Sequence, residues 1–155
     1  MFLKEVIQAL KQYEVPYCLI GGYALAMHGI VRATMDVDLA IKLNAKDLLA
    51  TQEALASIGL DSRLPLQAWE VARFRKEYIE KRNLIAWSFV DFQQPSRLVD
   101  ILLTKSLSHI KTKEIRFAGE KIKVASLEEL LKMKKQSARP QDLVDIERIQ
   151  EVLNE

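Results

Sequence analysis

Residues 19–29 of the chain read LIGGYALAMHG, and residues 32–39 read RATMDVDL. The apolar residues before the diglycine predict a short buried strand, the diglycine ends it, and the residues after it suit a helix. In the second segment Asp36 and Asp38 alternate with apolar residues, which predicts a strand with both carboxylates on one face. A strand, a glycine turn, a helix and a second strand therefore form the centre of the predicted fold.

The diglycine and the two aspartates each have a structural and a functional explanation. Most glycine pairs are simply turns, but glycines between a strand and a helix also let backbone N–H groups approach a phosphate. The Cα atoms of Asp36 and Asp38 would lie about 6–7 Å apart, so both side chains can converge on a pair of metal ions. We expect both on a buried strand, where a divalent cation is the simplest compensation for their repulsion and desolvation.

A third carboxylate, Asp100, lies within the apolar residues 97–103, which we predict to be a strand. A charged group among apolar strand residues needs a partner. An arginine partner would make Asp100 purely structural. The same metal ions would make it functional, provided that its strand lies beside that of Asp36 and Asp38.

The whole pattern predicts an α/β (α+β) fold with a mixed, mostly antiparallel sheet of four or five strands, flanked by helices. We expect a single domain over residues 1–155, with a core of about 1–125 and C-terminal helices over 126–155. Further strands are predicted over residues 84–92 and in a hairpin around 115–124. Helices are predicted over residues 2–13, 45–58, 68–81, 126–136 and 140–153.

Composition limits the chemistry. One cysteine and two histidines cannot build a His/Cys zinc site in one chain, so a bound metal must be held by carboxylates, which favours Mg²⁺ or Mn²⁺. The absence of a signal peptide pattern, of a long apolar run and of cysteine pairs predicts a cytoplasmic protein with no membrane partner. Residues 104–139 hold ten Lys/Arg against four Asp/Glu, which is typical of either a solvated surface or a polyanion-binding one.

The ordered motifs resemble those of the polymerase-β-type nucleotidyltransferase superfamily. They comprise the diglycine, an Arg-x-Thr-x-Asp-x-Asp strand and a later strand aspartate. Within the superfamily, the chain is most similar to the branch that contains the nucleotidyltransferase toxins of type IV toxin–antitoxin systems and their small uncharacterised relatives. Lys134, followed by Arg139-Pro140-Gln141-Asp142 and then Asp145, resembles the C-terminal signature of that branch.

The resemblance implies transfer of a nucleoside monophosphate from an NTP to a hydroxyl acceptor, with release of pyrophosphate. The acceptor would be an RNA end, a protein or a small molecule, and a neighbouring toxin–antitoxin gene would encode a partner protein. The resemblance implies two Mg²⁺ (or Mn²⁺) ions. It assigns catalysis and metal binding to Asp36, Asp38 and Asp100, and nucleotide binding to Gly21, Gly22, Tyr23, Arg32, Thr34 and Lys134.

Other interpretations stay open. Lys134 fits a solvated helix face equally well, and Arg139, Asp142 and Asp145 fit an ion-pair cluster at a helix start. An alternative function is a non-catalytic nucleotide- or partner-binding protein, antitoxin-like, on the same fold. A nucleic-acid-binding module that uses the basic segment 104–139 is a third.

Overall fold

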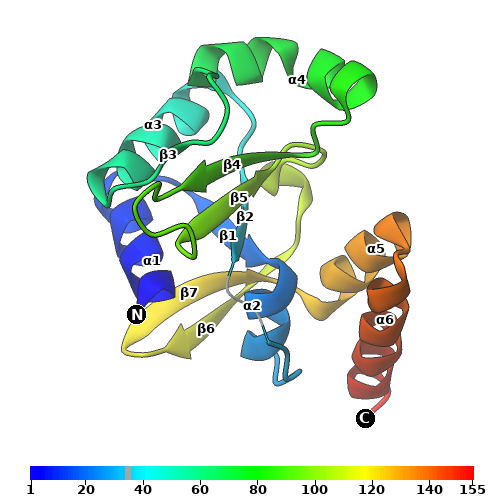
Figure 1. Cartoon of the computed structure of the whole chain (residues 1–155). Coiled ribbons are helices and arrows are strands. Elements are labelled where there is room, and N and C mark those ends of the chain that lie inside the picture. The colour runs from blue at the N-terminus through cyan, green and yellow to red at the C-terminus, as the bar shows by residue number, and fades with distance from the viewer. Residues whose placement is uncertain (34–35) are drawn as a thin grey trace.

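The computed structural model describes residues 1–33 and 36–155, which form a seven-stranded mixed sheet with helices around it (Figure 1). The strand order is β3-β4-β5-β2-β1-β7-β6. The strands are β1 (Tyr17–Ile20), β2 (Val37–Ile41), β3 (Asp61–Ser62), β4 (Ala86–Val90), β5 (Leu98–Leu102), β6 (Thr112–Phe117) and β7 (Glu120–Ala125). The α-helices are α1 (Phe2–Gln12), α2 (Gly21–Met27), α3 (Ala45–Ser57), α4 (Ala68–Arg82), α5 (Leu127–Ser137) and α6 (Pro140–Leu153).

The predicted fold class and the mixed, mostly antiparallel sheet are confirmed. The pairs β1–β2, β3–β4, β4–β5 and β6–β7 are antiparallel, whereas β2–β5 and β1–β7 are parallel. The predicted number of four or five strands is too low. The two-residue strand β3 is too short to give an alternating pattern, and β7 brings the whole hairpin into the sheet through the pair Leu19–Val124.

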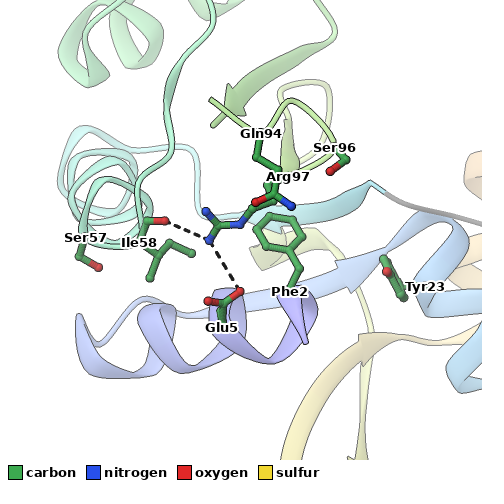
Figure 2. A pocket seen from close by; sticks show the side chains of 8 residues that line it. All are labelled: Phe2, Glu5, Tyr23, Ser57, Ile58, Gln94, Ser96 and Arg97. Carbon is green, nitrogen blue, oxygen red and sulfur yellow. Dashed lines mark hydrogen bonds and ion pairs between the residues drawn. The ribbon is translucent and has the colours of Figure 1, made fainter. Parts of the chain in front are cut away.

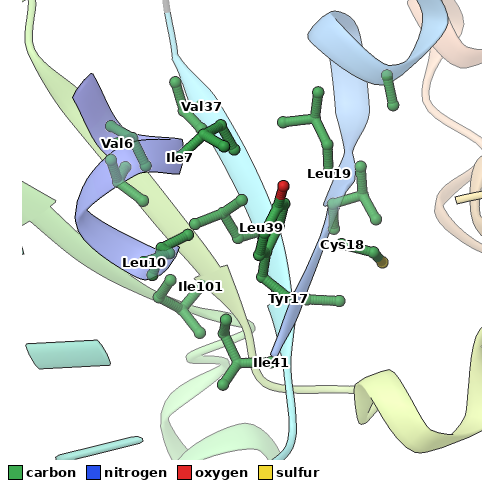
Figure 3. Packing of buried hydrophobic residues seen from close by; sticks show 14 of the residues in the cluster. Val6, Ile7, Leu10, Tyr17, Cys18, Leu19, Val37, Leu39, Ile41 and Ile101 are labelled. Atoms are coloured by element: carbon green, nitrogen blue, oxygen red, sulfur yellow. The ribbon is translucent and has the colours of Figure 1, made fainter. Parts of the chain in front are cut away.

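Part of the hydrophobic core lies between the sheet and α1. Val6, Ile7 and Leu10 of this amphipathic helix pack against the strand residues Leu39 and Ile101, all with 0% exposure (Figure 3). Leu39 and Ile101 occupy neighbouring positions in the β2–β5 pair, so their side chains share one face of the sheet. The alternate residues of the same strands, which include the aspartates, consequently face the other side.

Helices α5 and α6 pack against each other, and α5 also contacts α2 (Figure 1). Ser126 accepts a hydrogen bond from the Glu129 backbone N–H and begins α5, as its capping pattern predicts. Pro140 occupies the first turn of α6. The C-terminal helices are thereby placed beside the diglycine helix. In the part of the chain that the structure describes, no helix has the length and apolar character needed to cross a membrane.

Candidate active site

Three segments that are far apart in the sequence meet where β1 ends. Ile20, the last residue of β1, pairs with Asp38 of β2. Asp38 in turn pairs directly with Asp100 of β5, because the two strands run parallel in this register. Neighbouring strands are about 4.8 Å apart, so two half-buried carboxylates lie side by side on one face of the sheet.

The diglycine is the first turn of α2 rather than a loop before it, since the helix begins at Gly21 directly after β1. Gly21 has φ +70°, and a Cβ atom at this position would lie 2.2 Å from Oδ2 of Asp38. Gly21 therefore makes room for the Asp38 carboxylate. This is a different reason for glycine from the close approach of a phosphate that the sequence suggests.

We expect Gly21→Ala to destabilise the protein more than Gly29→Ala does. Gly29 has φ +88°, and a Cβ atom added there would have no neighbour within 4 Å, so Gly29→Ala adds only backbone strain of about 1–2 kcal/mol. Gly21→Ala adds a similar strain and must also displace Asp38, at a further cost of about 1–3 kcal/mol. Urea unfolding of the two variants measures the difference, and equal losses would contradict the close contact with Asp38.

Asp36 does not lie on a buried strand. The strand β2 begins one residue later, at Val37, and Asp36 is exposed, so the predicted burial of this residue is wrong. Partial desolvation and then the negative charge of Asp100 raise the pKa of Asp36, while Arg63 lowers it. The effect of Asp100 indicates that Asp36 still lies near the other acids. Thr34, predicted to bind the nucleotide, lies outside the described residues.

The electrostatics of the site centre on Asp38. Burial raises its pKa to about 7, and the negative charges of Asp100 and Asp36 act in the same direction. Lys134 and Arg32 oppose the rise. The carboxylate form of Asp38 is thus unfavourable in the metal-free fold, which is typical of a group whose position serves chemistry rather than stability.

We expect the stability of the metal-free protein to fall as the pH rises from about 4 to 7. The pKa of the Asp38 carboxyl is about 4 in the unfolded chain, whereas burial raises the pKa to about 7 in the folded protein. Across this window the folded state keeps a proton that the unfolded chain has lost, so the free energy of unfolding decreases and then levels off. Urea unfolding with a chelator at pH 5, 6, 7 and 8 measures this slope. Asp38→Asn should flatten it, and an unchanged slope would contradict the raised pKa.

Asp100 is held by a serine. The Ser88 hydroxyl on β4 donates a hydrogen bond to Oδ1 of Asp100, from the position directly opposite it in the β4–β5 pair. Among the described residues, no arginine or lysine forms an ion pair with Asp100. The purely structural arginine partner considered from the sequence is therefore not found there.

Arg32 and Lys134 both lie near Asp38, but acids of α6 bind them. Arg32 forms an ion pair with Asp145, and Lys134 Nζ lies 3.1 Å from Oδ2 of the same carboxylate. Lys134 also pairs with Asp142 at 3.2 Å. The structure places Lys134 in a buried ion-pair network with only 12% of its side chain exposed, so the solvated-face interpretation of this lysine is wrong.

A divalent cation fits the donors that meet here. Asp38 and Asp100 offer only oxygen atoms, the ligands that Mg²⁺ and Mn²⁺ prefer, and a cation between them would relieve the repulsion that raises the pKa of Asp38. Within residues 1–33 and 36–155, however, no three His, Cys, Asp or Glu side chains are gathered as a ready-made metal site. The carboxylates of Asp38 and Asp100 are brought together by the fold, and Asp36 stands beside them.

The Tyr23 side chain lies elsewhere. It lines a groove of about 880 Å³ together with Phe2 and Glu5 of α1 and Arg97 of the β4–β5 connection (Figure 2). The Arg97 guanidinium donates to the Ile58 carbonyl at 3.1 Å and lies 3.6 Å from Glu5. None of the three aspartates lines this groove.

The sequence does not reveal the partners of two residues at the site, Ser88 and Asp145. Ser88 stands in the aromatic strand segment AWSFV, where its alternation with Trp87 and Phe89 indicates the polar face but not its partner. Asp145 fits a helix-start ion-pair cluster by its sequence, and its pairing with Arg32 joins segments that only the tertiary fold brings together. His28 ends α2, and a hydrogen bond between its Nε2 and the Ala125 carbonyl at 2.9 Å packs this helix end against β7.

No family model and no curated protein matches the chain. Several solved structures do match it in fold. ANT(2'')-Ia, an antibiotic-resistance factor studied in solution, has a TM-score of 0.65 and 14% identity over 96% of this chain and 80% of that one. Crystalline ANT(2'')-Ia in complex with adenylyl-2''-tobramycin has a TM-score of 0.62 and 12% identity over 95% and 84%. A Thermotoga maritima protein proposed to be a nucleotidyltransferase has a TM-score of 0.59 and 15% identity over 98% and 90%.

Proposed function

We propose, from the nucleotidyltransferase fold that this chain shares with those structures, that it transfers a nucleoside monophosphate from an NTP to an acceptor hydroxyl and releases pyrophosphate. The observation that carries the proposal is the direct pairing of Asp38 with Asp100 where β1 becomes α2. The fold alone does not require two carboxylates at this place. Their mutual repulsion is unfavourable without a ligand, and such pairs cluster at functional sites.

In this proposal Asp38 and Asp100, with Asp36 beside them, would hold two Mg²⁺ or Mn²⁺ ions. Such ions, when bound, would supply Lewis acidity for the attacking oxygen and positive charge for the leaving pyrophosphate. The exposed position of Asp36 leaves room for a nucleotide to approach from solvent. Asp38 lies deeper, packed closely against Gly21.

The first turn of α2 supports the proposal that the phosphates bind there. The backbone N–H groups of Gly21, Gly22 and Tyr23 have no partner within the helix, and this end of α2 carries its positive dipole. Arg32 and Lys134 lie near Asp38 but are paired with acids of α6, so either cation must exchange a carboxylate for a phosphate to bind the nucleotide. The proposed nucleotide-binding role of Thr34 is supported only by the sequence resemblance.

The transfer step uses the Asp100 carboxylate as the proton acceptor. The acceptor oxygen forms a bond to the α-phosphorus while the bond from this phosphorus to the pyrophosphate oxygen breaks. The hydroxyl proton passes to Asp100, whose orientation Ser88 fixes by its hydrogen bond to Oδ1. Pyrophosphate leaves with the electron pair of the broken bond.

The acceptor belongs to one of three proposed classes: an RNA end, a protein hydroxyl or a small-molecule hydroxyl. The ANT(2'')-Ia complex contains an adenylylated small molecule, tobramycin, which supports testing the third class. The resemblance to toxins of type IV systems adds a partner protein from a neighbouring gene to the proposal.

The decisive experiment incubates the purified chain with each α-³²P-labelled NTP and Mg²⁺ or Mn²⁺. Total cell RNA, cell protein and a panel of small-molecule alcohols are offered separately as acceptors. We expect label to move to one acceptor class, with an equal amount of pyrophosphate released, and a chelator to stop the transfer.

Two outcomes decide against this reaction. Metal-dependent NTP binding without transfer to any acceptor would favour the non-catalytic, antitoxin-like alternative. If neither transfer nor NTP binding is detected, the proposed nucleotide site is ruled out. In that case, salt-dependent RNA binding that survives Asp38→Asn would support the nucleic-acid-binding module.

A further inference from the structure

The strand β6 ends the sheet, and one of its two edges has no partner in the described chain (Figure 1). Residues 118–119 connect β6 to β7, and both have positive φ angles (50° and 80°), as in a type I′ hairpin turn. The residue before such a turn is hydrogen-bonded to the opposite strand, and the residues of β6 then alternate. The backbone N–H and C=O groups of Thr112, Glu114 and Arg116 therefore point away from β7.

Two of the three outward-facing residues on this edge are charged, and one of them, Glu114, lies opposite Lys123 on β7. Glu114 and Arg116 are exposed, and neither forms an ion pair or a side-chain hydrogen bond with another residue in the described ranges. Arg116 lies opposite Lys121 on β7, a like-charge pair that destabilises the hairpin. A negative group on the free side of Arg116 would offset this repulsion.

The sequence of β6, TKEIRF, complements itself in an antiparallel arrangement. Outward-facing residues must pair with outward-facing residues, so a two-fold axis through Ile115 places Glu114 of each copy opposite Arg116 of the other. Ile115 then meets its own counterpart in the closer, non-hydrogen-bonded position. Moving the two-fold axis by one residue sets Glu114 or Arg116 against itself, and moving it by two residues towards Thr112 sets Lys113 against itself, which puts like charges together.

We propose that β6 is a self-association edge, through which a second copy of this chain extends the sheet across a two-fold axis. The opposite charges and the outward backbone groups select one register among those that an antiparallel pair allows. Charged residues on an edge strand also serve to prevent pairing in some proteins. That role predicts that removing the charges promotes association, which is the reverse of what complementarity predicts.

Sedimentation equilibrium of the full chain over a range of concentrations tests the proposal. We expect wild-type protein to shift from one chain mass towards two. Glu114→Arg and Arg116→Glu each replace two opposite-charge contacts with two like-charge contacts, and each should weaken association about tenfold. The double variant Glu114→Arg/Arg116→Glu restores both contacts and should regain wild-type association. Because the single variants change the net charge in opposite directions, net charge alone cannot explain a common loss.

Two further variants complete the experiment. Glu114→Pro removes an outward N–H and leaves the β6–β7 hydrogen bonds intact, so it should remain folded by circular dichroism and monomeric. Lys76→Glu reverses an exposed charge on α4 and should associate like wild type. Wild-type protein that stays monomeric at every concentration would overturn the proposal. So would tighter association of the single variants, a double variant that fails to recover, or wild-type association of a folded Glu114→Pro.

Discussion

Asp38→Asn should abolish nucleotidyl transfer while making the metal-free fold more stable at neutral pH. Asn keeps the shape against Gly21 but removes a charge that Asp100 and Asp36 repel, so unfolding should require more urea at pH 8. Loss of a carboxylate from the proposed metal site should lower the transfer rate at least ~10³-fold, since such a site contributes several kcal/mol to the transition state. The labelled-NTP assay and urea unfolding measure the two effects.

The matched control is Asp61→Asn, which neutralises an exposed strand aspartate outside the site. We expect this variant to keep the wild-type rate and stability. A stable Asp38→Asn protein that still transfers at the wild-type rate would remove Asp38 from catalysis. An inactive variant that is also less stable at pH 8 would contradict the repulsion among the acids.

The second large effect concerns stability. Asp142 is fully buried and accepts hydrogen bonds from Ser137 Oγ at 2.8 Å and from the Arg139 backbone N–H and Nε at 3.0 Å. It also pairs with Lys134. Burial raises the pKa of Asp142, but these hydrogen bonds outweigh it and hold the pKa well below its usual range. The carboxylate therefore stabilises the packing of the start of α6 against the end of α5.

Asp142→Ala should lower the free energy of unfolding by about 3–5 kcal/mol, because it leaves buried polar partners without an acceptor. Glu151→Ala, an exposed change on the same helix, should stay within about 0.5 kcal/mol of wild type. Urea unfolding at pH 7 compares the two. A loss below about 1 kcal/mol for Asp142→Ala would mean that the network is compensated by water after the carboxylate is removed.

Local signals in the sequence are enough for most elements of the fold, but not for the two-residue strand β3. Glycine after the β1 residues, the capping serine at 126 and the alternation around Asp38 each depend on neighbours in the chain, and each element lies where predicted. The boundaries differ from the predicted ones by up to three residues, since β6 begins at Thr112, three residues before the predicted hairpin. A difference of this kind leaves Asp36 outside β2 and exposed, so its predicted burial is wrong.

The candidate site is less predictable, because it depends on which strands become neighbours. Asp100 lies beside Asp38 only if their two strands are neighbours, and no local sequence pattern specifies this strand order. In the structure β2 and β5 are neighbours and run parallel, which brings the two aspartates together. The same limit applies to Lys134. Its helix is predictable, but the acids that surround it come from a different helix, where their sequence fits a separate cluster.

The parallel pairing of β1 with β7 has a consequence for how the protein folds. It joins Leu19 to Val124, so a very long loop must close before β7, and the helices that follow it, can dock. Contacts of such high sequence separation form slowly, whereas the β1–β2 and β6–β7 pairs are comparatively local. The half of the molecule that carries Asp38 can therefore acquire its structure well before Lys134 reaches it, and nucleotide binding should be among the last properties to appear during refolding.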